Sequence, residues 1–159
     1  MADLTYIRIP SGFVYLAVIL DAWSRRVVGR ALGRRTDAGL ALAALEAALA
    51  AREPPPGCVH HSDRGSRYAP GPCRAKLEAH GLKGSLGRRG NPYGNAKAGS
   101  FMRTLRHEEV PLNGYETFAD VVARLPRFLE EVYNVRRPHS ALGYLSPARF
   151  EEINTREAA

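Results

Sequence analysis

The sequence predicts an α/β fold with a mixed five-stranded sheet, in which three antiparallel strands come first and helices flank the sheet. Three segments of strand character, separated by short turns, lie within residues 1–31 and indicate an antiparallel meander. Helical and strand patterns then alternate along the chain. With 159 residues, 45% of them hydrophobic, the chain is long enough to bury one core. We therefore expect a single domain over residues 1–159, with a C-terminal helix and tail over about 115–159.

The first three strands follow from residue type and turn chemistry. Residues 3–9 are rich in β-branched and aromatic side chains, and Pro10-Ser11-Gly12 is suited to a turn after them. Residues 13–20 are almost all apolar, which is typical of a strand covered on both faces. After a turn at residues 21–24, residues 25–31 are expected to form the third strand.

An alanine-rich helix is expected after the meander. Thr36 or Asp37 is suited to cap its N-terminus, and the helix should run to about Arg52. Its inward face carries leucines at helical spacing, namely Leu42, Leu45 and Leu49. The run Pro54-Pro55-Pro56-Gly57 then ends the helix.

Shorter elements alternate over the middle of the chain. Residues 58–61 are expected to form a fourth strand, residues near 70–80 a helix, and residues 82–86 a brief fifth strand. A glycine- and arginine-rich loop then runs from Gly87 to Asn95. This loop lacks the Gly-Lys-Ser/Thr ending of a nucleotide-binding loop, although it is suited to touch a DNA backbone.

Two further helices are expected in the second half. Residues 96–109 should form one of them, capped by Asn95 or Gly94. Its inward face would hold the apolar side chains of Phe101, Met102 and Leu105. The other helix is expected to span about 117–134.

The net charge of +7 is concentrated in one region. Residues 64–107 contain ten Lys or Arg and one acid, Glu78, so this region alone carries a net charge of +9. Such a patch attracts polyanions, and each phosphate that it neutralises steepens the salt dependence of binding by about 0.9 in log–log slope. The alternative is a solvated surface in a chain of biased composition, because 20 of the 23 basic residues are Arg. We favour nucleic-acid binding.

The sequence lacks the features of a membrane or secreted protein. No apolar run reaches the ~18 residues that a membrane span needs, and no basic segment followed by an apolar one opens the chain. Cys58 and Cys73 fit no metal-binding spacing and do not indicate a disulfide framework. We therefore expect a location in the reducing cytoplasm and no membrane partner.

Two acids stand at the ends of predicted strands. Asp3 opens the first strand, and Asp63 follows the fourth within the motif His60-His61-Ser62-Asp63-Arg64-Gly65-Ser66-Arg67-Tyr68. If these strands are neighbours, the two carboxylates could hold a divalent cation, which enzymes that move phosphoryl groups along DNA require. The alternatives are an ordinary turn acid at Asp63 and an unremarkable terminal acid at Asp3.

A series of motifs occurs along the chain in the order found in one family. The motifs are Asp3-Leu4-Thr5-Tyr6-Ile7, residues 20–29, residues 60–68, Gly90-Asn91-Pro92-Tyr93, Asn95-Ala96-Lys97-Ala98, and residues 133–147 with Arg136-Arg137-Pro138-His139-Ser140. By these motifs the chain resembles the catalytic core of the insertion-sequence transposases that are close relatives of retroviral integrase. The resemblance implies a ribonuclease-H-like fold, Mg²⁺ or Mn²⁺ as the cofactor, and cutting and joining of transposon ends.

The resemblance also implies roles for single residues. Asp3 and Asp63 match the first two metal-binding catalytic acids of the family's DDE triad, whereas Gly99 stands where the family has a glutamate as the third. Arg106 matches a basic residue that contacts end DNA in the family, and the alternative is a simple exposed helix cation. The expected DNA contacts are Arg64, Arg67, Arg88, Arg89, Lys97, Arg103 and Arg106.

Gly99 predicts a weak or inactive polynucleotidyl transferase, because removing one stabilising group costs roughly 10²–10³ in rate. Glu108 and Glu109 lie about 14 Å further along a helix, which makes them poor substitutes. The first hypothesis is therefore a DDE transposase core, acting in DNA integration, with impaired catalysis. The alternatives are a non-catalytic DNA-binding relic of a transposase and a structure-specific nuclease of ribonuclease-H type.

The resemblance further implies partners and a location. Family members have an upstream segment and a separate helix-turn-helix DNA reader, whereas Asp3 is the third residue here, which implies a core truncated at its N-terminus. The implied partners are transposon-end and target DNA, further copies of the chain assembled on DNA, and a separate helix-turn-helix transposase subunit. The implied location is the bacterial cytoplasm, at the nucleoid when the protein is bound to DNA.

Other residues invite interpretation as site residues. Side chains of adjacent strand residues point to opposite faces, so His60 and His61 are not expected to share one metal ion, although one ring can lie near the carboxylates. Asp21 is expected to support the turn after the second strand. His139 matches the family, but the sequence does not explain its role.

Overall fold

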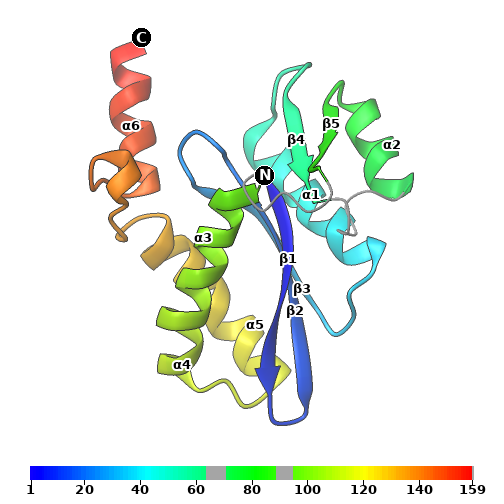
Figure 1. The fold of residues 1–159 in the computed structure, drawn as a ribbon, viewed down its shortest axis with the longest axis vertical. Helices are drawn as coiled ribbons and strands as arrows, with labels where there is room; N and C mark the ends of the chain where they lie inside the picture. Colours follow the sequence, from blue (N-terminus) through cyan, green and yellow to red (C-terminus); the bar gives the residue numbers. More distant parts are fainter. Residues whose placement is uncertain (64–70, 89–94, 159) are drawn as a thin grey trace.

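The computed structural model describes residues 1–63, 71–88 and 95–158. It contains one mixed sheet of five strands in the order β3-β2-β1-β4-β5 (Figure 1). The strands are β1 (Ala2–Ile9), β2 (Gly12–Leu20), β3 (Val27–Gly33), β4 (Val59–Ser62) and β5 (Lys83–Leu86). The first three run antiparallel to one another, whereas β4 runs parallel to both β1 and β5. The predicted fold class and sheet are confirmed, although the third strand begins at Val27 because the preceding turn is longer than expected.

The helices also agree in order with the prediction. The α-helices are α1 (Ala38–Arg52), α2 (Gly71–Ala79), α3 (Ala96–Thr104), α4 (Val110–Asn113), α5 (Phe118–Arg127) and α6 (Pro147–Ala158). Two π-helical segments, η2 (Leu105–Glu109) and η3 (Phe128–Tyr133), continue α3 and α5, and η4 (Ser140–Leu142) is a short 3₁₀ helix. The helix expected over 96–109 therefore extends to Asn113. Among the residues that the structure describes, none of the helices has the length and apolarity needed to cross a membrane.

Two cores lie on opposite faces of the sheet. Strand β2 shows both, because Val14 and Leu16 belong to the core under α3 and α5, whereas Ala17 and Ile19 belong to the core under α1 and α2. Figure 1 shows these two pairs of helices on the two sides of the sheet. The expectation of a strand covered on both faces is therefore met by β2.

Helix α1 lies very close to the sheet. Asp37 caps it, since the Asp37 Oδ1 accepts the Leu40 N–H at 2.9 Å. Under the helix, a Cβ atom on Gly29 of β3 would lie 2.4 Å from the Ala44 carbonyl oxygen and 2.6 Å from the Ala48 Cβ. Only a residue without a side chain fits at this point, because normal contacts between such atoms are above 3 Å.

The start of β3 is paired with a side chain from the second half of the chain. The buried amide of Asn134 accepts the Val27 N–H at 2.9 Å and donates to the Val27 carbonyl oxygen at 3.0 Å. It thus takes the place of a neighbouring strand at this residue. Asn134 thereby ties the segment after η3 to the sheet.

We expect Asn134→Leu to lower the free energy of unfolding by about 3 kcal/mol, because two buried backbone groups of Val27 would lose their partners. Urea denaturation followed by circular dichroism measures this change. Asn154→Leu is the matched control, since the Asn154 amide donates to the Phe150 carbonyl oxygen on α6 at 2.8 Å and is only partly buried. Equal losses for the two variants would contradict the role assigned to Asn134.

Helix α6 is docked by a buried acid. The Glu151 carboxylate accepts hydrogen bonds from Ser24 Oγ at 2.6 Å and from Arg26 Nη1 at 2.8 Å, and it also pairs with Arg52. These donors together lower the pKa of Glu151 against the opposing effect of its burial. The turn between β2 and β3 is therefore held between α6 and the end of α1.

Candidate active site

The two predicted acids meet at one edge of β1. Ala2 of β1 pairs with Ser62 of the parallel strand β4, so the next residues along each strand, Asp3 and Asp63, are neighbours. Adjacent strands lie about 4.8 Å apart. Burial raises the pKa of Asp3, its bond from the Leu4 N–H lowers it, and the charge of Asp63 raises it again. The two carboxylates therefore interact directly through their charges.

The end of β5 closes one side of this pair. A Cβ atom on Gly87 would lie 3.2 Å from Asp63 Oδ1 and 3.8 Å from His61 Nε2. The Asp63 carboxylate and the His61 ring therefore both lie next to Gly87. The His61 ring is oriented by a 3.0 Å contact between its Nδ1 and Ser85 Oγ. Its Nε2 is buried and has no hydrogen-bond partner among the described residues. His61 is thus the histidine that lies near the carboxylates.

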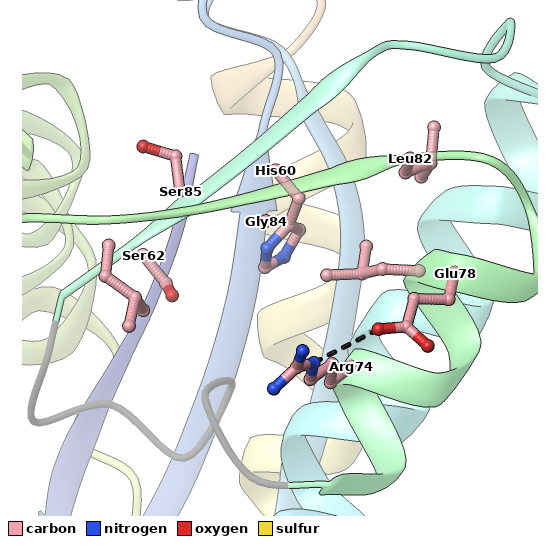
Figure 2. A pocket seen from close by; sticks show the side chains of 9 residues that line it. His60, Ser62, Arg74, Glu78, Leu82, Gly84 and Ser85 are labelled. Atoms are coloured by element: carbon pink, nitrogen blue, oxygen red, sulfur yellow. Dashed lines mark hydrogen bonds and ion pairs between the residues drawn. The ribbon is translucent and has the colours of Figure 1, made fainter.

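His60 lies on the opposite face of β4, as the alternation of strand side chains predicts. It lines a cavity of about 380 Å³ between the strands and α2. Figure 2 shows its ring pointing from β4 toward α2, where Arg74 and Glu78 form an ion pair with a distance of 3.1 Å from Arg74 Nε to Glu78 Oε1. The two histidines therefore do not face a common ion.

The stability of the protein is expected to fall on acidification because of His60. Burial lowers its pKa from 6.5 to about 4 in the folded chain, with a smaller contribution from the charge of the terminal amine. Between these two values the unfolded chain binds a proton that the folded chain does not bind. The contribution of neutral His60 to the free energy of unfolding is therefore fully present above about pH 6.5. It falls by about 2–3 kcal/mol as the pH falls toward 4.

Urea denaturation at pH 7 and pH 4.5 tests this expectation. His60→Leu should reduce the difference in unfolding free energy between the two pH values, because Leu binds no proton. The exposed His80→Leu is the control and should leave the difference as it is in the parent. An unchanged difference in His60→Leu would mean that other groups cause the acid sensitivity.

Gly99 faces the same space as Asp3. A surface depression of about 410 Å³ is lined by Asp3, Leu4, Gly99, Met102, Arg103, Arg106 and His107. A Cβ atom on Gly99 would meet no atom within 4 Å. Position 99 on α3 is therefore open toward the first acid, which is the geometry expected of a third carboxylate position.

Arg106 is held beside the acids. Its guanidinium donates to Thr5 Oγ1 at 3.2 Å, and its charge lowers the pKa of Asp3, opposing the larger effect of burial. Thr5 stands two residues after Asp3 and therefore on the same face of β1. Thr5 was not predicted as a site residue, although its spacing of two from Asp3 is a signal of a shared strand face.

Three of the other predicted DNA contacts lie among the described residues. Arg103 lines the depression with Arg106, and Arg88 is exposed just beyond the end of β5. The Lys97 Nζ donates to the Ala22 carbonyl oxygen in the turn after β2. Arg64, Arg67 and Arg89 lie outside the described residues.

Two acids further along the helix are engaged elsewhere. Glu108 forms an ion pair with Arg137, and Glu109 is buried, where it accepts a hydrogen bond from the Tyr115 hydroxyl. Neither lines the depression that holds Asp3 and Gly99. Within residues 1–63, 71–88 and 95–158, no three His, Cys, Asp or Glu side chains are grouped so that they could hold a metal ion.

The prediction that Asp21 supports its turn is confirmed, whereas the prediction that the Asn95 side chain caps α3 is wrong. Asp21 supports its turn as expected, since its Oδ1 accepts the N–H groups of Trp23 at 2.8 Å and Ser24 at 3.2 Å. Asn95 occupies the cap position of α3, but the expected side-chain cap is absent there. Its amide instead donates to the Ala2 carbonyl oxygen at 3.3 Å and so ties the start of α3 to β1. The alternative cap, Gly94, lies outside the described residues.

Comparison with protein families gives two matches that together cover most of the chain. Family models described as integrase core domain match residues 1–92 and residues 80–147. The first match includes Asp3 and Asp63, and the second includes Gly99 and Arg106.

Several proteins of insertion sequences are similar in sequence. A 31 kDa protein of insertion element IS600 from Shigella sonnei is 40% identical over 96% of this chain and 56% of its own length. The transposase of IS904 from Lactococcus lactis is 36% identical over 98% of this chain and 61% of its own length. The transposase InsF of IS3A from Escherichia coli is 38% identical over 96% of this chain and 53% of its own length. The chain thus spans a little more than half the length of these relatives.

Solved structures of retroviral proteins share the fold. The catalytic core domain of BIV integrase aligns with a TM-score of 0.63 and 16% identity, over 99% of this chain and 97% of that one. A chain of the simian T-cell lymphotropic virus intasome aligns with a TM-score of 0.73 and 14% identity, over 94% of this chain and 52% of that one. At such low identity these likenesses establish the fold alone.

Proposed function

This chain belongs to the integrase core domain family, as its motifs predicted, and we propose that it is a DDE-type transposase core whose catalysis is impaired by Gly99. The reaction would be phosphodiester strand transfer in DNA integration. One observation carries the proposal. Asp3 and Asp63 stand side by side at the edge of β1, while Gly99, which has no side chain, lines a depression together with Asp3.

The proposed cofactor is a divalent cation, Mg²⁺ or Mn²⁺. Asp3 and Asp63 would hold it, because carboxylate oxygens are the ligands that these hard ions prefer. The cation would stabilise negative charge on the oxygens of the reacting phosphate. Two carboxylates suit one cation, whereas a pair of cations needs further anionic ligands, and position 99 supplies none. The residues present therefore fit one divalent cation but not a pair of them.

Basic residues of α3 and η2 would bind the DNA backbone beside these acids. Arg106 and Arg103 border the depression, and a guanidinium can bind two phosphate oxygens at once. The hydrogen bond to Thr5 fixes the Arg106 side chain before DNA arrives, which reduces the ordering cost of binding. Lys97 and Arg88 would extend the contact on either side.

The partners of the whole protein are also proposals, because the relatives are longer than this chain. We infer that residues 1–159 act as one catalytic core on transposon ends and target DNA. Further copies of the chain would assemble with it on DNA, and a separate helix-turn-helix subunit would read the end sequence. Phosphate contacts alone carry no sequence information, so a separate reader is needed for specificity.

A second candidate function is a non-catalytic DNA-binding relic of a transposase. The absence of a carboxylate at Gly99 favours it, together with the engagement of Glu108 and Glu109 by other side chains. Such a protein would occupy DNA without cutting it.

Calorimetric titration with Mn²⁺ tests the proposed site. The parent chain is expected to bind one ion weakly, and Gly99→Glu to bind Mn²⁺ at least about tenfold more tightly, since one added charge at 4 Å contributes about 1–4 kcal/mol of attraction. Asp63→Ala is the control and should abolish binding in both backgrounds. Binding of two ions by the parent as tightly as by Gly99→Glu would show that another residue supplies the third ligand.

A further inference from the structure

The turn after β2 carries an arginine in an unfavourable backbone conformation. Arg25 has φ +61°, which belongs to the left-handed region that side chains other than glycine rarely adopt. Its N–H donates to the Asp21 carbonyl oxygen at 2.8 Å, and the Asp21 side chain holds the intervening residues. The turn is therefore fixed before any ligand binds.

A second bulky residue has the same backbone conformation in the loop that follows η3. Tyr144 has φ +63°, its N–H donates to the His139 carbonyl oxygen at 2.8 Å, and its side chain is 74% exposed. Among the described residues, the third non-glycine residue with positive φ is Glu53, which ends helix α1. Strain of this kind at exposed, chemically active side chains is a recognised mark of functional surfaces.

Arg25 and the loop around His139 form one surface. The rings of Tyr133 and His139 pack edge to face with centroids 5.1 Å apart. Burial lowers the pKa of His139, and the positive charges of Arg137 and then Arg25 lower it further. Burial raises the pKa of Tyr133 to about 12, while the same two arginines oppose that shift. The geometry places the Arg25 turn beside this segment, because the side chain of Asn134, the residue after Tyr133, binds the backbone of Val27, two residues after Arg25.

Two nitrogen atoms buried beneath this surface have no hydrogen-bond partner among the described residues. Arg137 is paired with Glu108, but its Nε is buried and has no partner among the described residues. The Nε2 of His139 is likewise buried, without a partner in the part of the chain that the structure describes. Exposed Arg136 adds a positive charge beside Arg137, whose partner is Glu108.

This surface adjoins the candidate active site across the start of α3. Lys97 joins α3 to the Arg25 turn through the Ala22 carbonyl oxygen, and Asn95 joins the same helix end to Ala2, the residue before Asp3. Figure 1 shows the loop between β2 and β3 beside the N-terminal end of α3. A polyanion bound at Asp3 and Asp63 can therefore continue over Lys97 onto Arg25.

We propose that Arg25, Arg137 and Tyr144 form a second contact for duplex DNA, which holds the backbone that flanks the reacting phosphate. This inference rests on the proposed function and extends it to a surface on the far side of α3. Guanidinium groups and a tyrosine hydroxyl are common donors to phosphate oxygens. Continuity with the active site favours DNA over an acidic protein as the occupant.

Fluorescence anisotropy with a labelled duplex, in EDTA and over a series of salt concentrations, tests this surface apart from catalysis. Arg137→Gln should weaken binding and lower the log–log salt slope by about 0.9, the value for one lost phosphate contact. The matched control is Arg127→Gln, which removes the same charge from an exposed pair with Glu131 on α5 and η3. It should leave both the affinity and the slope unchanged.

Two further variants separate a DNA contact from a structural role. Arg25→Gly should raise the thermal unfolding midpoint, since glycine adopts positive φ freely, and yet weaken DNA binding. Glu108→Gln should strengthen binding because it frees Arg137 from its partner, whereas Glu131→Gln should not. Weaker binding in Glu108→Gln would show that the pair serves folding and would overturn the inference.

The possible outcomes distinguish this inference from the proposed function. If the parent binds no duplex, the DNA-binding function and this surface both fail. If Arg106→Gln weakens binding but Arg25→Gly and Arg137→Gln do not, the function stands and the second contact is wrong. Displacement of the duplex from the parent, but not from Arg25→Gly, by polyglutamate of equal charge would indicate an acidic protein as the occupant and would also overturn the inference.

Discussion

Gly99→Glu is expected to raise the rate of DNA nicking and joining by at least about 10²–10³-fold over the parent chain in Mn²⁺. Position 99 opens onto the depression lined by Asp3, and a Cβ atom there meets nothing within 4 Å, so the longer side chain can enter without displacing the fold. The new carboxylate would complete a set of three anionic ligands. Gel analysis of a labelled duplex incubated with supercoiled plasmid measures both products.

Two controls isolate the charge from the shape of the new side chain. Gly99→Gln has the same length as the glutamate variant but no charge, and should remain as slow as the parent. Adding Asp63→Asn to Gly99→Glu should return the rate to the level of the parent. A parent chain that joins ends as fast as Gly99→Glu would show that the triad position has been assigned to the wrong residue.

Gly29→Ala is expected to lower the free energy of unfolding by about 3 kcal/mol or more, which is a large effect for one methyl group. The added Cβ would overlap the Ala44 carbonyl oxygen and the Ala48 Cβ, and backbone and a short side chain cannot turn away. Helix α1 would have to move off β3 and open the core beneath it. Urea denaturation at neutral pH measures the loss.

Gly99→Ala provides the matched comparison, since it makes the same chemical change in open space. It should stabilise the protein by about 0.5–1 kcal/mol, because alanine loses less conformational freedom in a helix than glycine does. The two substitutions are therefore expected to have opposite signs. Similar losses at both positions would mean that α1 is not packed on β3 as closely as described.

Much of the fold was predictable because it depends on local patterns. The apolar run of β2, the cap at Asp37 and the proline run after α1 each specify an element within a few residues. The start of β3 was not predictable, because Arg25 adopts a left-handed conformation that extends the turn by two residues. The π-helical segments η2 and η3 were also missed, since a wider turn leaves no clear mark on a helical hydrophobic pattern.

The candidate site was predictable where it depends on strand ends and not where it depends on long-range contacts. Asp3 and Asp63 were expected to meet if their strands were neighbours, and the register of β1 and β4 makes them so. By contrast, nothing local indicates that Arg106 donates to Thr5 or that Asn95 donates to Ala2. These contacts join segments about a hundred residues apart and follow only from how α3 packs against β1.

The exposed position of Gly99 on α3 has an evolutionary consequence. Position 99 faces open space, so the lack of a side chain there leaves no cavity in the core, and proteolytic surveillance of unfolded chains would not recognise the protein as defective. A lineage that lost this carboxylate would still produce a long-lived protein. Under the proposed function, such a protein would compete with intact copies for the same DNA and would restrain the spread of the element that encoded it.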